Sequence, residues 1–224
     1  MNITYEVIKK DEQVRAYIEA GNNALKALGF TEHSFPHASL TAETAAKILK
    51  ELGFSDEEIE LGKIAGFLHD IGNMINRSFH AASGAEIARN ILERLGVDYK
   101  DIGKICSAIG NHDENTGKPI SAVSAAVIIA DKSDVRRSRV QETCMEDIIN
   151  DIHDRVNYAV TRSEIKFIRF ETKIKIRLCL DIDIEFTPVM DYFEIFLGRM
   201  IMCRRAASFL GADFELFIND SKIV

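Results

Sequence analysis

Apolar residues recur at helical spacing through the first two thirds of the chain. Apolar positions three and four apart over residues 7–28 predict one amphipathic helix. Pro36 suits the first turn of a second helix, and Ser55 followed by Glu58 is the signature of a capping box at the start of a third. The helices predicted after the first lie at about 37–52, 55–70, 80–95, 99–111 and 119–134.

The period changes beyond about residue 157. Apolar and charged residues alternate over residues 174–185, which is typical of a half-buried strand. The neighbouring segments predict a hairpin partner strand, a helix and a last short strand, at 163–170, 188–210 and 214–218. We therefore expect a mainly α protein with an all-helical domain over residues 1–157 and a small α+β (β-β-α-β) appendage over residues 158–224.

Composition narrows the class of protein. The 224 residues, 46% of them hydrophobic, can bury one substantial core. The net charge of -7 argues against an extended nucleic-acid surface, because phosphate binding needs clustered Lys and Arg. No apolar stretch has the length of a membrane span or resembles a secretory signal, so we expect a soluble, cytoplasmic protein with no membrane partner.

Histidine and aspartate residues gather at the ends of the predicted helices. Of the 6 histidines, four have flanking sequences expected of helix ends, and His69 is followed at once by Asp70. Imidazole and carboxylate are the ligand types that divalent transition metals prefer where a water must stay bound and reactive. The pattern therefore indicates a metal-dependent hydrolase centre.

These residues give the chain a resemblance to the HD-domain metal-dependent phosphohydrolases over about residues 30–140. The family pattern is a His at the start of one helix, His-Asp at the end of the next, and an Asp on a later helix. Many members add two further histidines between the His-Asp pair and the last Asp. The matching residues here are His37, His69, Asp70, Asp131 and, for the two added histidines, His80 and His112.

The resemblance implies a helical bundle that binds divalent metal ions, two rather than one, of which Fe, Mn, Ni, Co, Zn and Mg are candidates. It implies that Asp70 bridges the metals and that Asp70 and His69 are the catalytic residues. His37, His69 and Asp131 would complete the shell of the first metal, and His80 and His112 would hold the second. Two such ions can clamp the attacking and leaving oxygens of a displacement at phosphorus.

Further polar residues are candidates for holding a phosphate group, because its non-bridging oxygens need donors and cations around them. The basic run after Asp131 has an alternative interpretation as a solvated helix end, and His33 has one as a loop histidine. On a helix that continues past Asp131, the arginines would flank the metals. The predicted substrate-binding residues are His33, Asn73, Arg77, Lys132 and Arg136.

Two departures from the family pattern limit which properties of the family are expected for this chain. Asn73 stands where members with His-Asp-Ile-Gly commonly have Lys, so the group that protonates the leaving group stays unassigned. The cyclic-di-nucleotide phosphodiesterase branch carries a Gly-Tyr-Pro signature, whereas residues 117–119 are Gly-Lys-Pro. We therefore do not assign the chain to that branch.

The leading functional hypothesis is a metal-dependent phosphohydrolase that cleaves a phosphate ester of a nucleotide or other small molecule through a metal-bridged hydroxide. One alternative is a nucleotide-binding regulatory sensor with little turnover. Another is an HD-type enzyme of non-phosphate chemistry, a hydratase or an iron oxygenase. The long strand of the appendage also suggests a homodimer, because such an edge is expected to be covered or paired.

Overall fold

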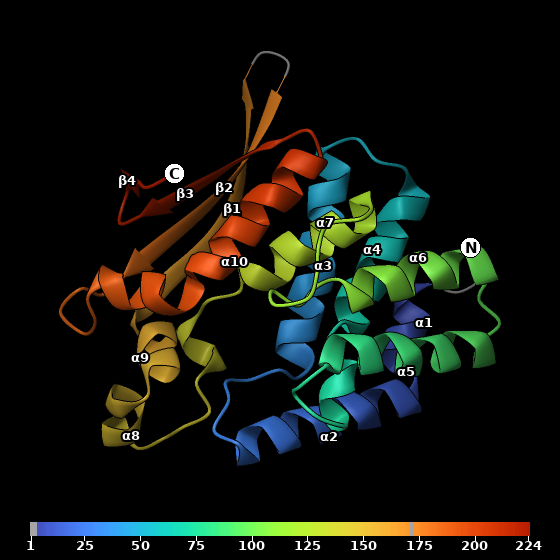
Figure 1. Ribbon diagram of the computed structural model, residues 1–224, viewed down its shortest axis with the longest axis horizontal. Helices are drawn as coiled ribbons and strands as arrows, with labels where there is room; N and C mark the ends of the chain where they lie inside the picture. Colours follow the sequence, from blue (N-terminus) through green and yellow to red (C-terminus); the bar gives the residue numbers. More distant parts are fainter. Residues whose placement is uncertain (1–3, 171–172) are drawn as a thin grey trace.

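The computed structural model describes residues 4–170 and 173–224 (Figure 1). The chain begins with α1 (Tyr5–Lys10) and α2 (Glu12–Ala27), and Asp11 lies between them in an extended conformation. The side chain of Asp11 accepts a hydrogen bond from the Val14 amide and so caps α2. The prediction of one helix over residues 7–28 is therefore wrong, because a capping residue interrupts the helical period.

Five longer helices confirm the remaining helices predicted for the first part of the chain. The capping box at the start of α4 is present, since Ser55 and Glu58 bind each other's backbone amides. A short 3₁₀ segment, η1 (Ile71–Met74), follows α4. The five helices are α3 (Phe35–Glu51), α4 (Asp56–Leu68), α5 (His80–Arg94), α6 (Tyr99–Gly110) and α7 (Ala122–Lys132).

Helix α7 is the centre of the helical bundle. Every residue from Val123 to Lys132 is buried, and the helix packs against α3, α4, α6 and α10 (Val189–Phe209). Residues 125–130 are apolar on all sides, so this part of the helix can be surrounded without burying unpaired polar side chains. The helix ends at Lys132, short of the predicted 134, so the following residues leave the helical path.

The connection from α7 to the sheet holds three short elements that the sequence did not predict. They are the 3₁₀ segment η2 (Arg137–Arg139), α8 (Met145–Asn150) and α9 (Ile152–Ala159). Each of the two α-helices has no more than eight residues, which is too few for a clear hydrophobic period.

The C-terminal part is a four-stranded sheet with one helix. Strands β1 (Val160–Phe170) and β2 (Lys173–Ile182) form an antiparallel hairpin, and β3 (Asp213–Ile218) pairs parallel to β2. The alternating apolar residues of β2 from Ile176 to Ile182 are buried, as the two-residue period predicts. The predicted β-β-α-β order is confirmed, with β4 (Ser221–Lys222) added after β3.

Figure 1 shows α10 lying across the sheet and beside α7. One continuous cluster of buried apolar residues runs from the helical bundle into the sheet. The expected boundary near residue 157 falls inside α9, and the division into domains at 157 and 158 stays a prediction. The homodimer also stays a prediction, although β1 does lie at an edge of the sheet. No helix within residues 4–170 and 173–224 combines the length and the apolarity needed to cross a bilayer.

Gly72 allows the start of α5 to lie against η1. A methyl group at Gly72 would clash with the carbonyl oxygen of His80 and would lie 2.6 Å from the Gly84 amide nitrogen. Both are backbone atoms, so no rotamer change relieves the contact. We expect Gly72→Ala to lower the free energy of unfolding by roughly 1–3 kcal/mol, measured by chemical denaturation.

The matched control for this change is Gly103→Ala in α6. A methyl group there meets no atom within 4 Å among the described residues. Alanine is the better helix former by about 0.5–1 kcal/mol, so this variant should gain stability. Equal effects of the two substitutions would contradict the close approach of η1 and α5.

Candidate metal centre

The ends of five helices bring the six predicted metal ligands to one place. His37 and His80 lie in the first turns of α3 and α5, and Asp131 lies in the last turn of α7. His69 follows α4 directly and is followed by Asp70, and His112 lies just beyond α6. Three overlapping groups have donor atoms within 4.8 Å of one another: His37, His69 and Asp70; His69, His112 and Asp131; Asp70, His80 and His112.

Hydrogen bonds that the Nδ1 atoms donate fix the tautomers of three of these histidines. The Nδ1 atoms of His69, His80 and His112 lie 2.7, 2.9 and 2.6 Å from the carbonyl oxygen three residues earlier in each case. A carbonyl oxygen can only accept, so Nδ1 carries the hydrogen and donates it. In the neutral ring, Nε2 then carries the lone pair.

The Nε2 atoms form two close pairs. His37 Nε2 lies 3.1 Å from His69 Nε2, and His80 Nε2 lies 3.1 Å from His112 Nε2. In the second pair, the tautomers place two lone pairs opposite each other, which is unfavourable unless a cation or a proton lies between them. The chemistry of this donor set therefore fits a divalent metal ion.

The Asp70 carboxylate lies between the two histidine pairs. Its Oδ2 is 3.3 Å from His69 Nε2 and 3.6 Å from His37 Nε2. Its Oδ1 is 3.3 Å from His80 Nε2 and 3.6 Å from His112 Nε2. Each oxygen thus faces one pair, as a carboxylate shared between two cations would.

Asp131 and Asp134 complete the side of the centre near His37. Asp131 Oδ1 is 3.4 Å from His37 Nε2, and its Oδ2 is 2.8 Å from Lys132 Nζ. Asp134 Oδ2 accepts a hydrogen bond of 2.7 Å from His37 Nδ1. His37 is therefore oriented by a carboxylate where the other three histidines are oriented by carbonyl groups.

The carboxylates of Asp70 and Asp131 control the charge of the centre. Burial lowers the pKa of His69, but the charges and hydrogen bonds of Asp70 and Asp131 outweigh it and raise the pKa to about 10. Burial would raise the pKa of Asp70, but His69 and the neighbouring histidines hold it well below its usual value. Burial lowers the pKa of His112 to about 4. The centre thus favours bound positive charge.

Three of the predicted substrate-binding residues surround Asp70. His33 Nε2 is 3.9 Å from Asp70 Oδ2, and Arg77 Nη1 is 3.8 Å from Asp70 Oδ1. Arg77 also donates to the side-chain oxygen of Asn73, which is buried. The side-chain nitrogen of Asn73 has no hydrogen-bond partner within the part of the chain that the structure describes.

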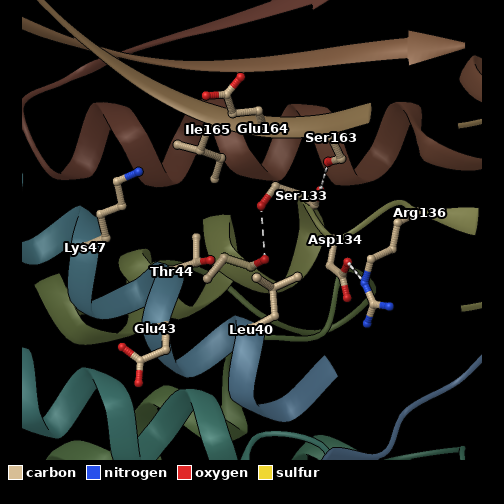
Figure 2. A pocket seen from close by; sticks show the side chains of 11 residues that line it. Leu40, Glu43, Thr44, Lys47, Ser133, Asp134, Arg136, Ser163, Glu164 and Ile165 are labelled. Carbon is tan, nitrogen blue, oxygen red and sulfur yellow. Dashed lines mark hydrogen bonds and ion pairs between the residues drawn. The ribbon is translucent and has the colours of Figure 1, made fainter. Parts of the chain in front are cut away.

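The other two, Lys132 and Arg136, are held by carboxylates. Lys132 is buried, and its ammonium group lies 2.8 Å from both Asp131 and Glu114. Arg136 donates to Asp134 at 2.8 Å. It also lines a cavity of about 360 Å³ between α3 and β1 (Figure 2). Their roles in substrate binding stay predictions.

A cavity of about 510 Å³ lies beside the second histidine pair. Its lining comes from the loop before α5 and the loop after α6, and His80 is part of it. This volume lies within the range of about 300–1,000 Å³ that is usual for small-molecule sites. The cavity lining includes Arg77, Phe79, His80, Glu114, Asn115 and Thr116.

Sequence reasoning missed the roles of Asp134, Arg139 and Glu114. Arg139 is buried, and it donates to the carbonyl oxygens of Glu32 and Asp134, which ties the segments before α3 and after α7 together. The three-residue spacing of Asp131 and Asp134 is a signal, but on a continuous helix it would place both residues on one helix face. In the structure, α7 has ended before Asp134.

Comparisons with known proteins identify the family. Residues 35–157, more than half of the chain, match the family model of the HD domain. The chain belongs to the HD-domain family, which confirms the resemblance inferred from the histidine and aspartate pattern.

The chain is 26% identical over 185 residues to the uncharacterized protein MJ1020 of Methanocaldococcus jannaschii, covering 72% of this chain and 70% of that protein. It is 28% identical over 172 residues to ribonuclease Y of Mycoplasma mycoides, covering 66% of this chain and 38% of that protein. The chain thus matches less than half the length of that ribonuclease.

A solved structure of a predicted HD superfamily hydrolase from an uncultured Thermotogales bacterium is 24% identical, with a TM-score of 0.44. The match covers 58% of this chain and 73% of that one.

The carboxylate behind His37 should strengthen metal binding. Asp134→Asn keeps the shape of the side chain but removes the charge that makes Nε2 of His37 a stronger metal ligand. We therefore expect metal affinity to fall by about 10–100-fold. Arg136→Gln is the matched control, because it removes the hydrogen bond to the other oxygen of the Asp134 carboxylate and leaves the His37 contact intact. Competition with a fluorescent chelator measures both affinities, and an equal loss in the two variants would contradict this role.

Metal binding should release protons from the centre. The raised pKa of His69 means that the apo protein keeps this ring protonated at neutral pH, and a cation at Nε2 must displace the proton. The apparent affinity should therefore decrease as the pH falls, by about tenfold per pH unit for each proton released. Titration calorimetry with Mn²⁺ in two buffers of different protonation enthalpy counts the protons, and identical heats in both buffers would contradict the prediction.

Proposed function

We propose that the protein is a metal-dependent phosphohydrolase that cleaves a phosphate ester of a nucleotide or other small molecule. The observation that carries this proposal is the arrangement of two pairs of histidine Nε2 atoms on either side of the Asp70 carboxylate. His37, His69 and Asp131 would hold one cation with Asp70 Oδ2, and His80 and His112 would hold a second with Asp70 Oδ1. Membership of the HD-domain family supports the same chemistry.

When bound, the divalent cations would lower the pKa of a water molecule and neutralise charge that develops on the phosphoryl oxygens. The protein residues around them orient the ester. Arg77 can bind a non-bridging oxygen beside Asp70, since its guanidinium group is half-buried and lies 3.8 Å from that carboxylate. Asn73 holds Arg77 in place by accepting a hydrogen bond from Nη1, and its buried amide nitrogen has no hydrogen-bond partner among the described residues.

His33 is placed to accept a hydrogen bond. Its Nδ1 lies 2.6 Å from the Thr31 carbonyl oxygen, so Nδ1 carries the hydrogen and Nε2 carries the lone pair toward Asp70. Burial, with a contribution from the charge of Arg139, holds the pKa of His33 well below its usual value. The ring is therefore neutral at pH 7 and serves as a hydrogen-bond acceptor for water or for a hydroxyl of the substrate.

The similarity to ribonuclease Y supports hydrolysis of a phosphodiester, because the name of that protein gives RNA as its substrate. We nevertheless propose a small substrate for this chain. The net charge of -7 is unfavourable for an extended RNA, and the cavity beside His80 has the volume of a small-molecule site.

The proposal is tested by elemental analysis and a screen of nucleotides and simple phosphate esters. We expect about two metal ions per chain and hydrolysis of at least one of these esters. Asp70→Asn should lose metal and lower kcat/KM by roughly 100-fold or more, because it removes the charge shared by both histidine pairs. His153→Ala is the matched control, since this histidine is exposed and lies outside the centre.

The other outcomes separate the alternatives. Bound metal and tight nucleotide binding without turnover would support a regulatory sensor. Bound iron with oxygen consumption, or hydration of an unsaturated substrate, would support non-phosphate chemistry. Protein that binds no divalent metal would contradict the assignment of the centre.

A further inference from the structure

Phe79 combines backbone strain with exposure to solvent. Its φ of 63° lies in the left-handed region, which a bulky side chain rarely adopts. The side chain gains little from burial in return, because the residue is 79% exposed. Within the described part of the chain, no other aromatic ring or cation is paired with its ring. Backbone strain of this kind clusters at active sites and ligand-binding segments.

The position of Phe79 links it to the candidate metal centre. It is the N-cap residue of α5, directly before His80, and it lines the 510 Å³ cavity. An N-cap normally offers a side-chain oxygen to the helix, and phenylalanine has none to offer. Capping therefore does not account for this residue.

We propose that Phe79 is the stacking platform for the base of a nucleotide substrate. This inference rests on the proposed function, because the phosphate of the same nucleotide would lie at the histidine pairs. An exposed aromatic ring stacks on any nucleobase, since every base presents a flat π face. Arg77 supplies a cation for the phosphate, and Asn115 and Thr116 supply polar groups in the same cavity for the sugar or the base edge.

The left-handed backbone gives the test an unusual control. Glycine adopts a φ of 63° without strain, so Phe79→Gly removes the ring and should not lower the stability of the fold. Phe79→Tyr keeps an aromatic face at the same position. Tyr99→Leu is the matched control, because Tyr99 is 80% exposed and lies at the end of α6 away from His112.

The experiment measures kcat/KM of the metal-loaded full chain for the four nucleoside 5′-monophosphates and for ribose 5-phosphate, which lacks a base. We expect Phe79→Gly to lower kcat/KM for nucleotides by at least about tenfold and to leave ribose 5-phosphate unchanged. Phe79→Tyr and Tyr99→Leu should both resemble the parent. Equal losses for all substrates, or no loss for nucleotides, would overturn the inference.

Failure of the proposed function would give a different result. If no ester is hydrolysed, equilibrium dialysis of the same nucleotides against the metal-loaded protein still compares the parent with Phe79→Gly. Weaker nucleotide binding in the variant would support stacking without hydrolysis, and equal binding would overturn it. If ribose 5-phosphate is hydrolysed and no nucleotide is a substrate, the phosphohydrolase proposal stands and the stacking inference falls.

Discussion

The structure depends on hydrogen bonds that fix the imidazole tautomers at the centre. The last carbonyl groups of a helix have no partner within the helix. His69, just past α4, and His112, just past α6, donate their Nδ1 hydrogens to such carbonyl groups, those of Gly66 and Ile109. Each bond places the hydrogen on Nδ1 and turns Nε2 toward Asp70, and the Ile109 carbonyl also accepts a hydrogen bond from the backbone amide of His112. His80 donates in the same way to the Arg77 carbonyl oxygen in the loop before α5. The centre therefore lies where helix ends and their adjoining loops meet.

Close packing of the helices is what allows the ends to meet. A methyl group on Gly66 would lie 3.0 Å from the backbone of Ala42, so a larger residue would force α3 and α4 apart. His37 and His69 are carried by these two elements, and their Nε2 atoms are only 3.1 Å from each other. The separation of the two imidazole rings is thus set by backbone packing some distance from the metal ligands themselves.

The sequence predicted most of the helices because their ends carry explicit signals. Ser55 with Glu58 marks the start of α4, and Pro36 lies in the first turn of α3. Asp11 was missed because its capping role depends on an extended backbone, which the helical pattern around it conceals. Short elements such as α8 and α9 have too few residues for a period to emerge.

The sequence likewise predicted only part of the candidate metal centre. The residue types and spacing identified six ligand candidates, and the structure brings these six side chains together. The role of Asp134 behind His37 could not be inferred, because it requires α7 to end at Lys132. The left-handed backbone of Phe79 has no sequence signal, since phenylalanine normally avoids that conformation.

Helix α10 is joined to the centre by charge as well as by apolar packing. Glu114, in the loop after His112, lies 2.8 Å from Lys132 and 3.5 Å from Arg199 of α10. Burial would raise the pKa of Glu114, but these two cations lower it to about 2. Lys132 in turn holds Oδ2 of Asp131, which leaves Oδ1 to face His37 and His69. Because a buried charge needs its partner, α10 helps to orient Asp131.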